Sequence, residues 1–220
     1  IIANNSSEKI IFGKNYNYKK NINGFFYKDD LGEINLPKPN LPGDFQISNI
    51  STAIATVRKL NEFKIKNSHI KTAITKIKSE GRLQNIIRGK LRNYVSKNNK
   101  ILIDGAHNPL AATVVTKYLR NLNSNKKVIM LLGMMANKEH KKFIEIFKNI
   151  VHSIVALNIP HQENFIEKTQ LCKIVQSCGI PSKTEDSIEL ALKNISKENS
   201  EAIIFCTGSL YFAGEILNLN

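Results

Sequence analysis

The sequence predicts an α/β protein in which residues 81–220 form a doubly wound, mostly parallel sheet. After Gly81, short apolar segments alternate with amphipathic segments of helical periodicity. The apolar segments are hydrophobic throughout, which is typical of strands that are covered by helices on both faces. Strands that alternate with helices in this way are typical of a parallel sheet.

Residues 1–80 are predicted to be the end of a different α/β domain. Short strands are expected at 9–13, 24–28 and 33–37, separated by turns and followed by a proline-rich segment. Apolar residues at helical spacing predict a helix over 48–60 and another over 70–77. The strands resemble the last part of a sheet whose beginning would precede residue 1.

Residues 82–95 have a hairpin-like pattern, and five β-α repeats are expected after them. The predicted strands are at 100–104, 127–133, 152–158, 180–183 and 201–207. The predicted helices are at about 109–121, 138–150, 167–178, 186–197 and 209–218. Ligands of such sheets bind beyond the carboxyl ends of the strands, so the site is expected in the segments that follow the strands.

The composition argues against several classes of function. The net charge is +14, but Lys and Arg are spread along the chain without interleaved aromatic residues, which favours a solvated basic surface over nucleic-acid binding. The three cysteines have no CxxC spacing and the five histidines no HxxxH or HxH pair, so neither disulfides nor a metal site are expected. No apolar run approaches the ~20 residues of a membrane span and no signal peptide is visible, so a cytoplasmic protein is expected.

The segment "ILIDGAHNP" passes from a predicted buried strand into Asp104, His107 and a helix start. Asn108 is a good N-cap and Pro109 fits the first helical position. Small residues between Asp104 and His107 would let a ligand approach the backbone closely. The segment alone allows two interpretations: a ligand site, or a strand-to-helix turn whose Asp and His hydrogen-bond only backbone groups.

Several motifs together resemble one family. "DGAHNPLAA" (104–112) resembles the C-terminal-domain signature of folylpolyglutamate synthases and dihydrofolate synthases, within the Mur ligase superfamily. Four more segments match this family in order: "LPGDFQISNISTAIA" (41–55), "GRLQ" (81–84), "LGMMANKEH" (132–140) and "CTGSLYFAGEIL" (206–217). The sequence departs from the usual motifs where Phe45 replaces His, Ile50 replaces Ala, and Asn137-Lys138-Glu139 replaces Asp-Lys-Asp.

The resemblance implies that residues 1–80 are the C-terminal part of a Mur-ligase-type central ATP-binding domain, and that 81–220 are a Rossmann-like, glutamate-binding C-terminal domain. No G-x-x-x-x-G-K-[ST] segment occurs in the sequence, so the ATP phosphate loop is missing and the chain is expected to be an inactive fragment. The Glu80-Gly81 pair would be the hinge between the two domains.

The implied activity is that of an ATP-dependent C–N ligase of folate biosynthesis and one-carbon metabolism, which adds L-glutamate to dihydropteroate or folate through an acyl phosphate. The implied cofactors are ATP and Mg²⁺, with metal ligands expected mainly in the missing N-terminal part. By the resemblance, Asn49, Arg82 and Asp104 would bind ATP. His107 would be catalytic and lie beside glutamate, and Ser209 would hold a glutamate carboxylate. Lys138 is expected to be solvated.

Two other functions stay open. One is another Mur-type ligase, which joins an amino acid to a UDP-linked peptidoglycan precursor, because that group shares an Asp-x-Ala-His-x-Pro core. The other is a non-catalytic α/β binding domain. The expected partners are small molecules (dihydropteroate or folate, L-glutamate and ATP), with no nucleic acid and no membrane. A monomer is favoured, although the sequence leaves the oligomeric state open.

Overall fold

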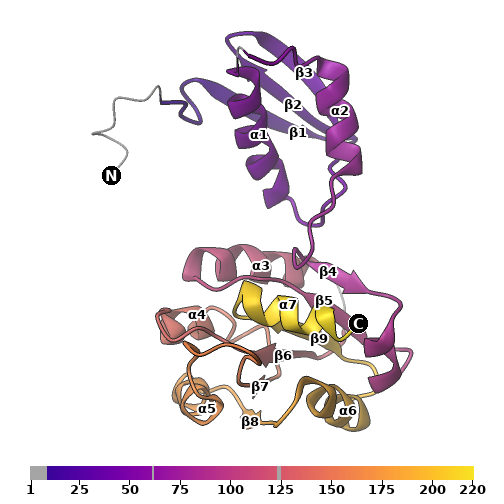
Figure 1. Cartoon of the computed structure of the whole chain (residues 1–220), viewed down its shortest axis with the longest axis vertical. Helices are drawn as coiled ribbons and strands as arrows, with labels where there is room; N and C mark the ends of the chain where they lie inside the picture. Colours follow the sequence, from indigo (N-terminus) through magenta and orange to yellow (C-terminus); the bar gives the residue numbers. More distant parts are fainter. Residues whose placement is uncertain (1–8, 61, 123–124) are drawn as a thin grey trace. The chain divides into compact units, whose positions relative to one another are not determined.

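A computed structural model describes residues 9–60, 62–122 and 125–220 (Figure 1). Residues 1–8, which the sequence assigns to strand and loop, lie outside the described part. The chain divides into two compact units, one ending at Ser79 and the other running from Glu80 to Asn220.

The first unit is a three-stranded antiparallel sheet with two helices packed on it (Figure 1). Its strands follow one another as a meander, and its elements are β1 (Tyr16–Asn21), β2 (Gly24–Asp29), β3 (Gly32–Pro37), α1 (Phe45–Arg58) and α2 (Asn67–Lys76). Phe25 and Tyr27 of β2 are fully buried against Ile50 and Ile54 of α1 and Ile70 of α2. The two predicted helices are confirmed to within a few residues.

The predicted strand at 9–13 is wrong, and β1 begins at Tyr16 instead. Gly13 has a φ of +81° and its N–H donates to the carbonyl of Tyr16, so the chain turns where a strand was expected. The sequence of β1, "YNYKKN", is mostly polar because only Tyr16 is buried in this edge strand. The hydrophobic pattern therefore favoured the wrong segment.

The second unit contains a six-stranded sheet in the order β4-β5-β9-β6-β7-β8. The strands are β4 (Gln84–Ile86), β5 (Lys100–Ile103), β6 (Val128–Leu132), β7 (Ser153–Ala156), β8 (Ser182–Thr184) and β9 (Ile203–Thr207). Every pairing is parallel except that of β4 with β5. The predicted doubly wound, mostly parallel sheet is confirmed.

Helices cover both faces of this sheet (Figure 1). The helices are α3 (Pro109–Asn121), α4 (His140–Glu145), α5 (Lys168–Ser177), α6 (Ile188–Glu198) and α7 (Leu210–Asn218). One face packs against α6, α7 and a 3-10 helix, η2 (Lys90–Tyr94), and the opposite face against α3, α4 and α5. The central strands are consequently buried on both sides, which explains their uninterrupted hydrophobic sequences.

Two predictions in this unit are wrong. The segment 82–95 is not a hairpin: β4 pairs with β5, and Gly89, with a φ of +104°, leads into η2. The helix predicted over 138–150 is α4, which ends at Glu145 and continues as turns. Sequence periodicity cannot distinguish these turns from a helix, because buried Phe143 and Phe147 keep helical spacing across both.

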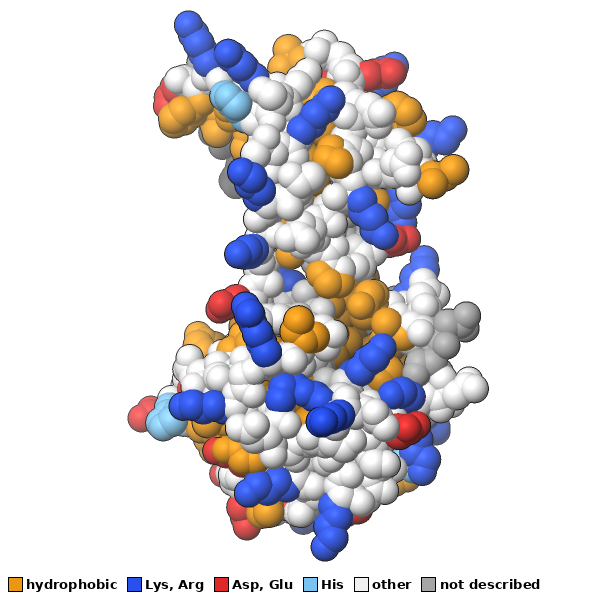
Figure 2. Space-filling model, turned by 90° about the vertical axis from the view of Figure 1, so that its right-hand side faces the viewer, with side chains coloured by type: hydrophobic (Ala, Val, Ile, Leu, Met, Phe, Trp, Pro, Cys, Tyr) orange, Lys and Arg blue, Asp and Glu red, His pale blue; other side chains and the backbone are white. Residues whose placement is uncertain are grey.

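The basic residues do not form one continuous surface on the face seen in Figure 2, where Lys and Arg side chains are scattered over both units. This distribution is the one that the sequence predicts. Among the described residues, no helix combines the length and hydrophobicity needed to cross a bilayer. The three cysteines are free and buried.

Candidate functional site

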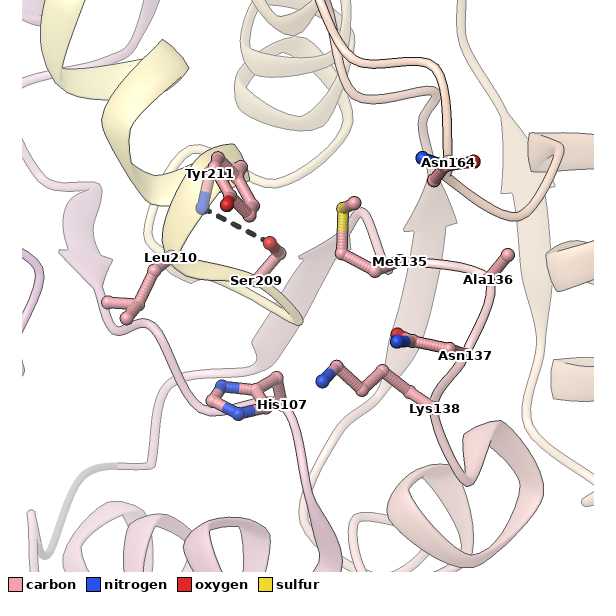
Figure 3. Close-up of a pocket in the computed structure, with 9 residues that line it drawn as sticks. All are labelled: His107, Met135, Ala136, Asn137, Lys138, Asn164, Ser209, Leu210 and Tyr211. Carbon is pink, nitrogen blue, oxygen red and sulfur yellow. Dashed lines mark hydrogen bonds between the residues drawn. The ribbon is translucent and has the colours of Figure 1, made fainter.

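A pocket of about 580 Å³ lies at the carboxyl edge of the parallel sheet (Figure 3). Its lining comes from the segments that follow β5, β6, β7 and β9, and consists of His107, Met135, Ala136, Asn137, Lys138, Asn164, Ser209, Leu210 and Tyr211. Parallel pairing of these strands brings residues from distant parts of the sequence to one edge. The pocket therefore lies where a doubly wound sheet is expected to bind its ligand.

The imidazole of His107 is held in one orientation by its own loop. His107 Nδ1 lies 3.0 Å from the carbonyl oxygen of Gly105, which can only accept, so Nδ1 carries the proton in this bond. In the neutral ring, Nε2 is then the acceptor. The next residues start α3 as predicted, because Asn108 accepts from the N–H of Ala111 at 2.9 Å and Pro109 takes the first helical position.

Ser209 begins α7 at another wall of the pocket. Its Oγ accepts the N–H of Tyr211 at 3.1 Å, so the hydroxyl proton remains available to a ligand. The turn before it requires glycine: Gly208 has a φ of +111°, and a Cβ there would lie 2.5 Å from the carbonyl oxygen of Gly133. The geometry presents the start of α7 and the Ser209 hydroxyl at one place in the pocket.

The loop after β6 forms a third wall and carries Lys138. It is fixed to the loop after β7, because the N–H of Ala136 donates to the carbonyl of Asn164 at 2.8 Å. Lys138 is half-buried and its ammonium points toward His107 (Figure 3). The sequence predicts that Lys138 is a solvated residue near a helix start; it lies just before α4, remains partly exposed and also lines the pocket.

Asp104 does not line this pocket. Its carboxylate is buried and its two oxygens accept the N–H groups of Leu83 and Ala106 at 2.9 and 2.8 Å. Burial raises the pKa of the Asp104 carboxyl, while the two N–H groups and the charge of Arg82 act to lower it. Leu83 has a φ of +48°, an uncommon conformation for a non-glycine residue, and its bond to Asp104 fixes the backbone directly after Arg82.

The remaining predicted residues lie elsewhere. Arg82 is exposed at the start of the second unit. Asn49 is exposed on α1 of the first unit, where its Nδ2 donates to Gln46 Oε1 at 3.1 Å. Gln46 is buried, and its Nε2 has no hydrogen-bond partner within the described ranges. A buried donor without a partner lowers the stability of the fold, so Gln46 is a candidate ligand-binding residue that the sequence alone did not single out.

Comparison with known proteins identifies the family. The family model described as the dihydrofolate synthetase C-terminal domain matches residues 83–219. The chain belongs to the dihydrofolate synthetase family. Among curated members, the dihydrofolate synthase/folylpolyglutamate synthase of Buchnera aphidicola is 26% identical over 214 residues, covering 96% of this chain and 47% of that protein. The dihydrofolate synthetase of Saccharomyces cerevisiae is 23% identical, covering 86% of this chain and 47% of that protein. The chain thus spans about half the length of these relatives.

Solved structures of the dihydrofolate synthetase family share the fold. Escherichia coli FolC in complex with DHPP and ADP has a TM-score of 0.76 at 22% identity, over 94% of this chain and 46% of that chain. The Yersinia pestis bifunctional folylpolyglutamate synthase/dihydrofolate synthase, complexed with AMPPNP and Mn, has a TM-score of 0.74 at 17% identity, over 94% of this chain and 46% of that chain. At these identities the likeness establishes the fold, and residue roles depend on the geometry described above.

Proposed function

We propose that the intact protein containing this chain is an ATP-dependent amide ligase that adds L-glutamate to dihydropteroate, folate or both. The observation that carries this proposal is the pocket in which His107, Lys138 and Ser209 converge at the carboxyl edge of the sheet. An oriented imidazole, an ammonium group and a helix N-terminus suit an anionic amino acid. The family relationship and the nucleotide complexes of related structures support the same conclusion.

The proposed reaction has two steps. The γ-phosphoryl group of ATP is transferred to a carboxylate of the pteroate or folate, which gives ADP and an acyl phosphate. The neutral amine of glutamate then attacks the acyl carbon, the C–O bond to phosphate breaks, and the amine loses one proton. His107 Nε2 is the group that we assign to orient the amine and take this proton, because Nδ1 is occupied by Gly105.

Residues 1–80 are proposed to be part of the ATP-binding domain, and residues 81–220 the glutamate-binding domain. In the first, Asn49, which is exposed on α1, is proposed to contact ATP. In the second, Arg82 is proposed as an ATP contact. Asp104 supports it by fixing the N–H of Leu83, the next residue.

A divalent metal is expected in the intact enzyme, where Mg²⁺ would neutralise charge on the ATP phosphates. Within residues 9–60, 62–122 and 125–220, no group of three or more His, Cys, Asp and Glu side chains is arranged to hold a metal ion. We therefore assign no step to a metal ligand from these residues. The proposed partners are small molecules, and the proposed state is a cytoplasmic monomer.

The test is turnover by the intact enzyme and by residues 1–220 alone. The intact enzyme should release ADP and phosphate only when dihydropteroate or folate and L-glutamate are both present. Residues 1–220 alone should not turn over ATP, because the sequence has no phosphate-binding loop. Turnover by the intact enzyme with a UDP-linked peptidoglycan precursor instead would identify it as another Mur-type ligase. If the intact protein bound its ligands tightly but released no ADP or phosphate with any of these substrates, it would be a non-catalytic binding domain.

A further inference from the structure

Arg82 is an exposed residue whose two neighbours in sequence are both buried and both have left-handed backbone conformations. Gly81 has a φ of +63° and Leu83 a φ of +48°, and Leu83 is fully buried. A leucine keeps such a conformation only where the surrounding structure holds it there, because its Cβ crowds the backbone. The direction in which the chain presents Arg82 therefore depends on the contacts that hold these two neighbours.

Three hydrogen bonds hold the two left-handed residues. The N–H of Leu83 donates to Asp104 Oδ2 at 2.9 Å. The carbonyl of Gly81 accepts the N–H of Gly105 at 2.8 Å. The third bond comes from within the segment, where the N–H of Gly81 donates to the side-chain oxygen of Gln84, Oε1, at 2.9 Å. Gly81 is thus fixed through both its N–H and its carbonyl group, and one of these bonds requires the Gln84 side chain.

Gln84 is itself held in place by the sheet. It begins β4, where it pairs with Ile103 of β5, and it is partly buried. The backbone N–H of Gly81 can only donate, so the side-chain atom that faces it is the amide oxygen and not the amide nitrogen. A residue anchored in a strand therefore reaches back three positions and closes the turn that carries Arg82.

We propose that Gln84 is a positioning residue for ATP binding, which fixes Gly81 and thereby orients Arg82 before the nucleotide binds. This inference rests on the proposed function, in which Arg82 contacts ATP, and Gln84 itself touches no substrate. An arginine that extends from a fixed backbone loses less conformational freedom when it binds a ligand. Without the bond, Gly81 can take many other conformations because it has no Cβ, and the chain would present Arg82 in many directions.

The test measures the Kd for ATP of the intact enzyme by calorimetry, without folate or glutamate, so that no glutamate is added during the measurement. Gln84→Met keeps the size of the side chain but removes the acceptor. It should raise the Kd for ATP by about 2- to 10-fold, the usual contribution of one hydrogen bond. Gln84→Glu keeps an acceptor oxygen and should recover part of the affinity. Asn85→Ala, at the exposed next residue, is the matched control and should bind ATP like the wild type.

The same change in a second background shows whether Gln84 acts through Arg82. Arg82→Met should raise the Kd for ATP by about 10- to 100-fold, the usual loss for a hydrogen bond to a charged group. Adding Gln84→Met to it should change the Kd hardly further, because the side chain that Gln84 positions is already gone. Amide hydrogen exchange at Gly81 should accelerate in Gln84→Met in both backgrounds.

A merely structural Gln84 gives a different pattern. Gln84→Met would then lower the Tm and leave the Kd for ATP unchanged, or raise the Kd equally in both backgrounds, and either result would overturn the proposal. Arg82→Met that binds ATP like the wild type would overturn it as well. A wild-type enzyme that binds ATP but adds no glutamate to folate or dihydropteroate would refute the proposed function, and the comparison of the two backgrounds would still decide the role of Gln84.

Discussion

Replacing Asp104 tests whether the buried carboxylate holds the fold of the second unit. Asp104→Asn keeps the shape of the side chain but leaves one acceptor oxygen for two buried N–H groups, those of Leu83 and Ala106. One unpaired buried donor costs about 1–3 kcal/mol, and Asp104→Ala, which leaves both unpaired, should cost about twice as much. For a chain of this length, 1 kcal/mol corresponds to about 2–4 °C in Tm.

Thermal melts followed by circular dichroism measure this loss, and amide hydrogen exchange locates it. Exchange should accelerate first at the N–H groups of Leu83 and Ala106, because these lose their acceptor. Asp186→Asn is the matched control, since its carboxylate is 87% exposed and should change stability by less than about 0.5 kcal/mol. Melts and exchange in Asp104→Ala that match the wild type would refute the structural role of Asp104.

The raised pKa of Asp104 predicts how the stability difference between the wild type and Asp104→Asn changes with pH. Because the folded-state pKa exceeds the ordinary carboxyl value of about 4, the folded chain binds more protons than the unfolded chain between these two values. The contribution of Asp104 to the free energy of unfolding therefore decreases as pH rises through this interval. The stability difference between wild type and Asp104→Asn should grow on acidification from neutral pH, and a difference that shrinks would contradict this direction.

Three further predictions concern the pocket and the core. His107→Ala should lower kcat/KM for glutamate in the intact enzyme by about 100-fold, or about 2.7 kcal/mol, with an unchanged Tm, and normal kinetics would exclude it from the reaction. Gly208→Ala should lower the free energy of unfolding, measured in urea, by about 3 kcal/mol or more, because Gly208 has a φ of +111° and an added Cβ would meet the carbonyl oxygen of Gly133. Gly214→Ala in α7 is the control: the space around Gly214 is open, so this change should be neutral or stabilising by up to about 1 kcal/mol. Burial raises the pKa of Cys206 to about 12, so mass spectrometry of the native chain at pH 8 should find it unmodified by iodoacetamide, and rapid alkylation would show that the core opens.

The fold could be predicted largely from sequence because each parallel strand is buried on both faces and is therefore hydrophobic throughout. Elements without that property were missed or misplaced: β1 is a polar edge strand, and η2 depends on contacts with the chain end, where the N–H of Lys90 donates to the carbonyl of Asn220. Such contacts join residues far apart in sequence. Local periodicity cannot report them.

The candidate site could be predicted only in part, for a similar reason. The Asp-Gly-Ala-His motif and the Gly-Ser start of α7 are local signals, and the structure brings His107 and Ser209 to one pocket. Lys138 belongs to a loop whose position depends on the backbone hydrogen bond from Ala136 to Asn164, which no local sequence pattern indicates. The motif allowed two interpretations, a ligand site or a turn stabilised by side-chain bonds to the backbone, and each fits one of its residues. Asp104 accepts from backbone N–H groups, whereas His107 faces the pocket.

Backbone hydrogen bonds between the loops hold the fold around the pocket without using the side chains that line it. The N–H of Gly105 donates to the carbonyl of Gly81, that of Gly208 to Ala106, and that of Gly133 to Thr207, so the loops after three neighbouring strands are tied together without using a pocket side chain. Changes to Asp104 or Gly208 alter this backbone framework and should appear in stability. Changes to the pocket side chains of His107 or Lys138 leave the framework intact and should appear in kinetics. A pocket built in this way can change its ligand preference by side-chain substitution while the fold that positions it stays the same.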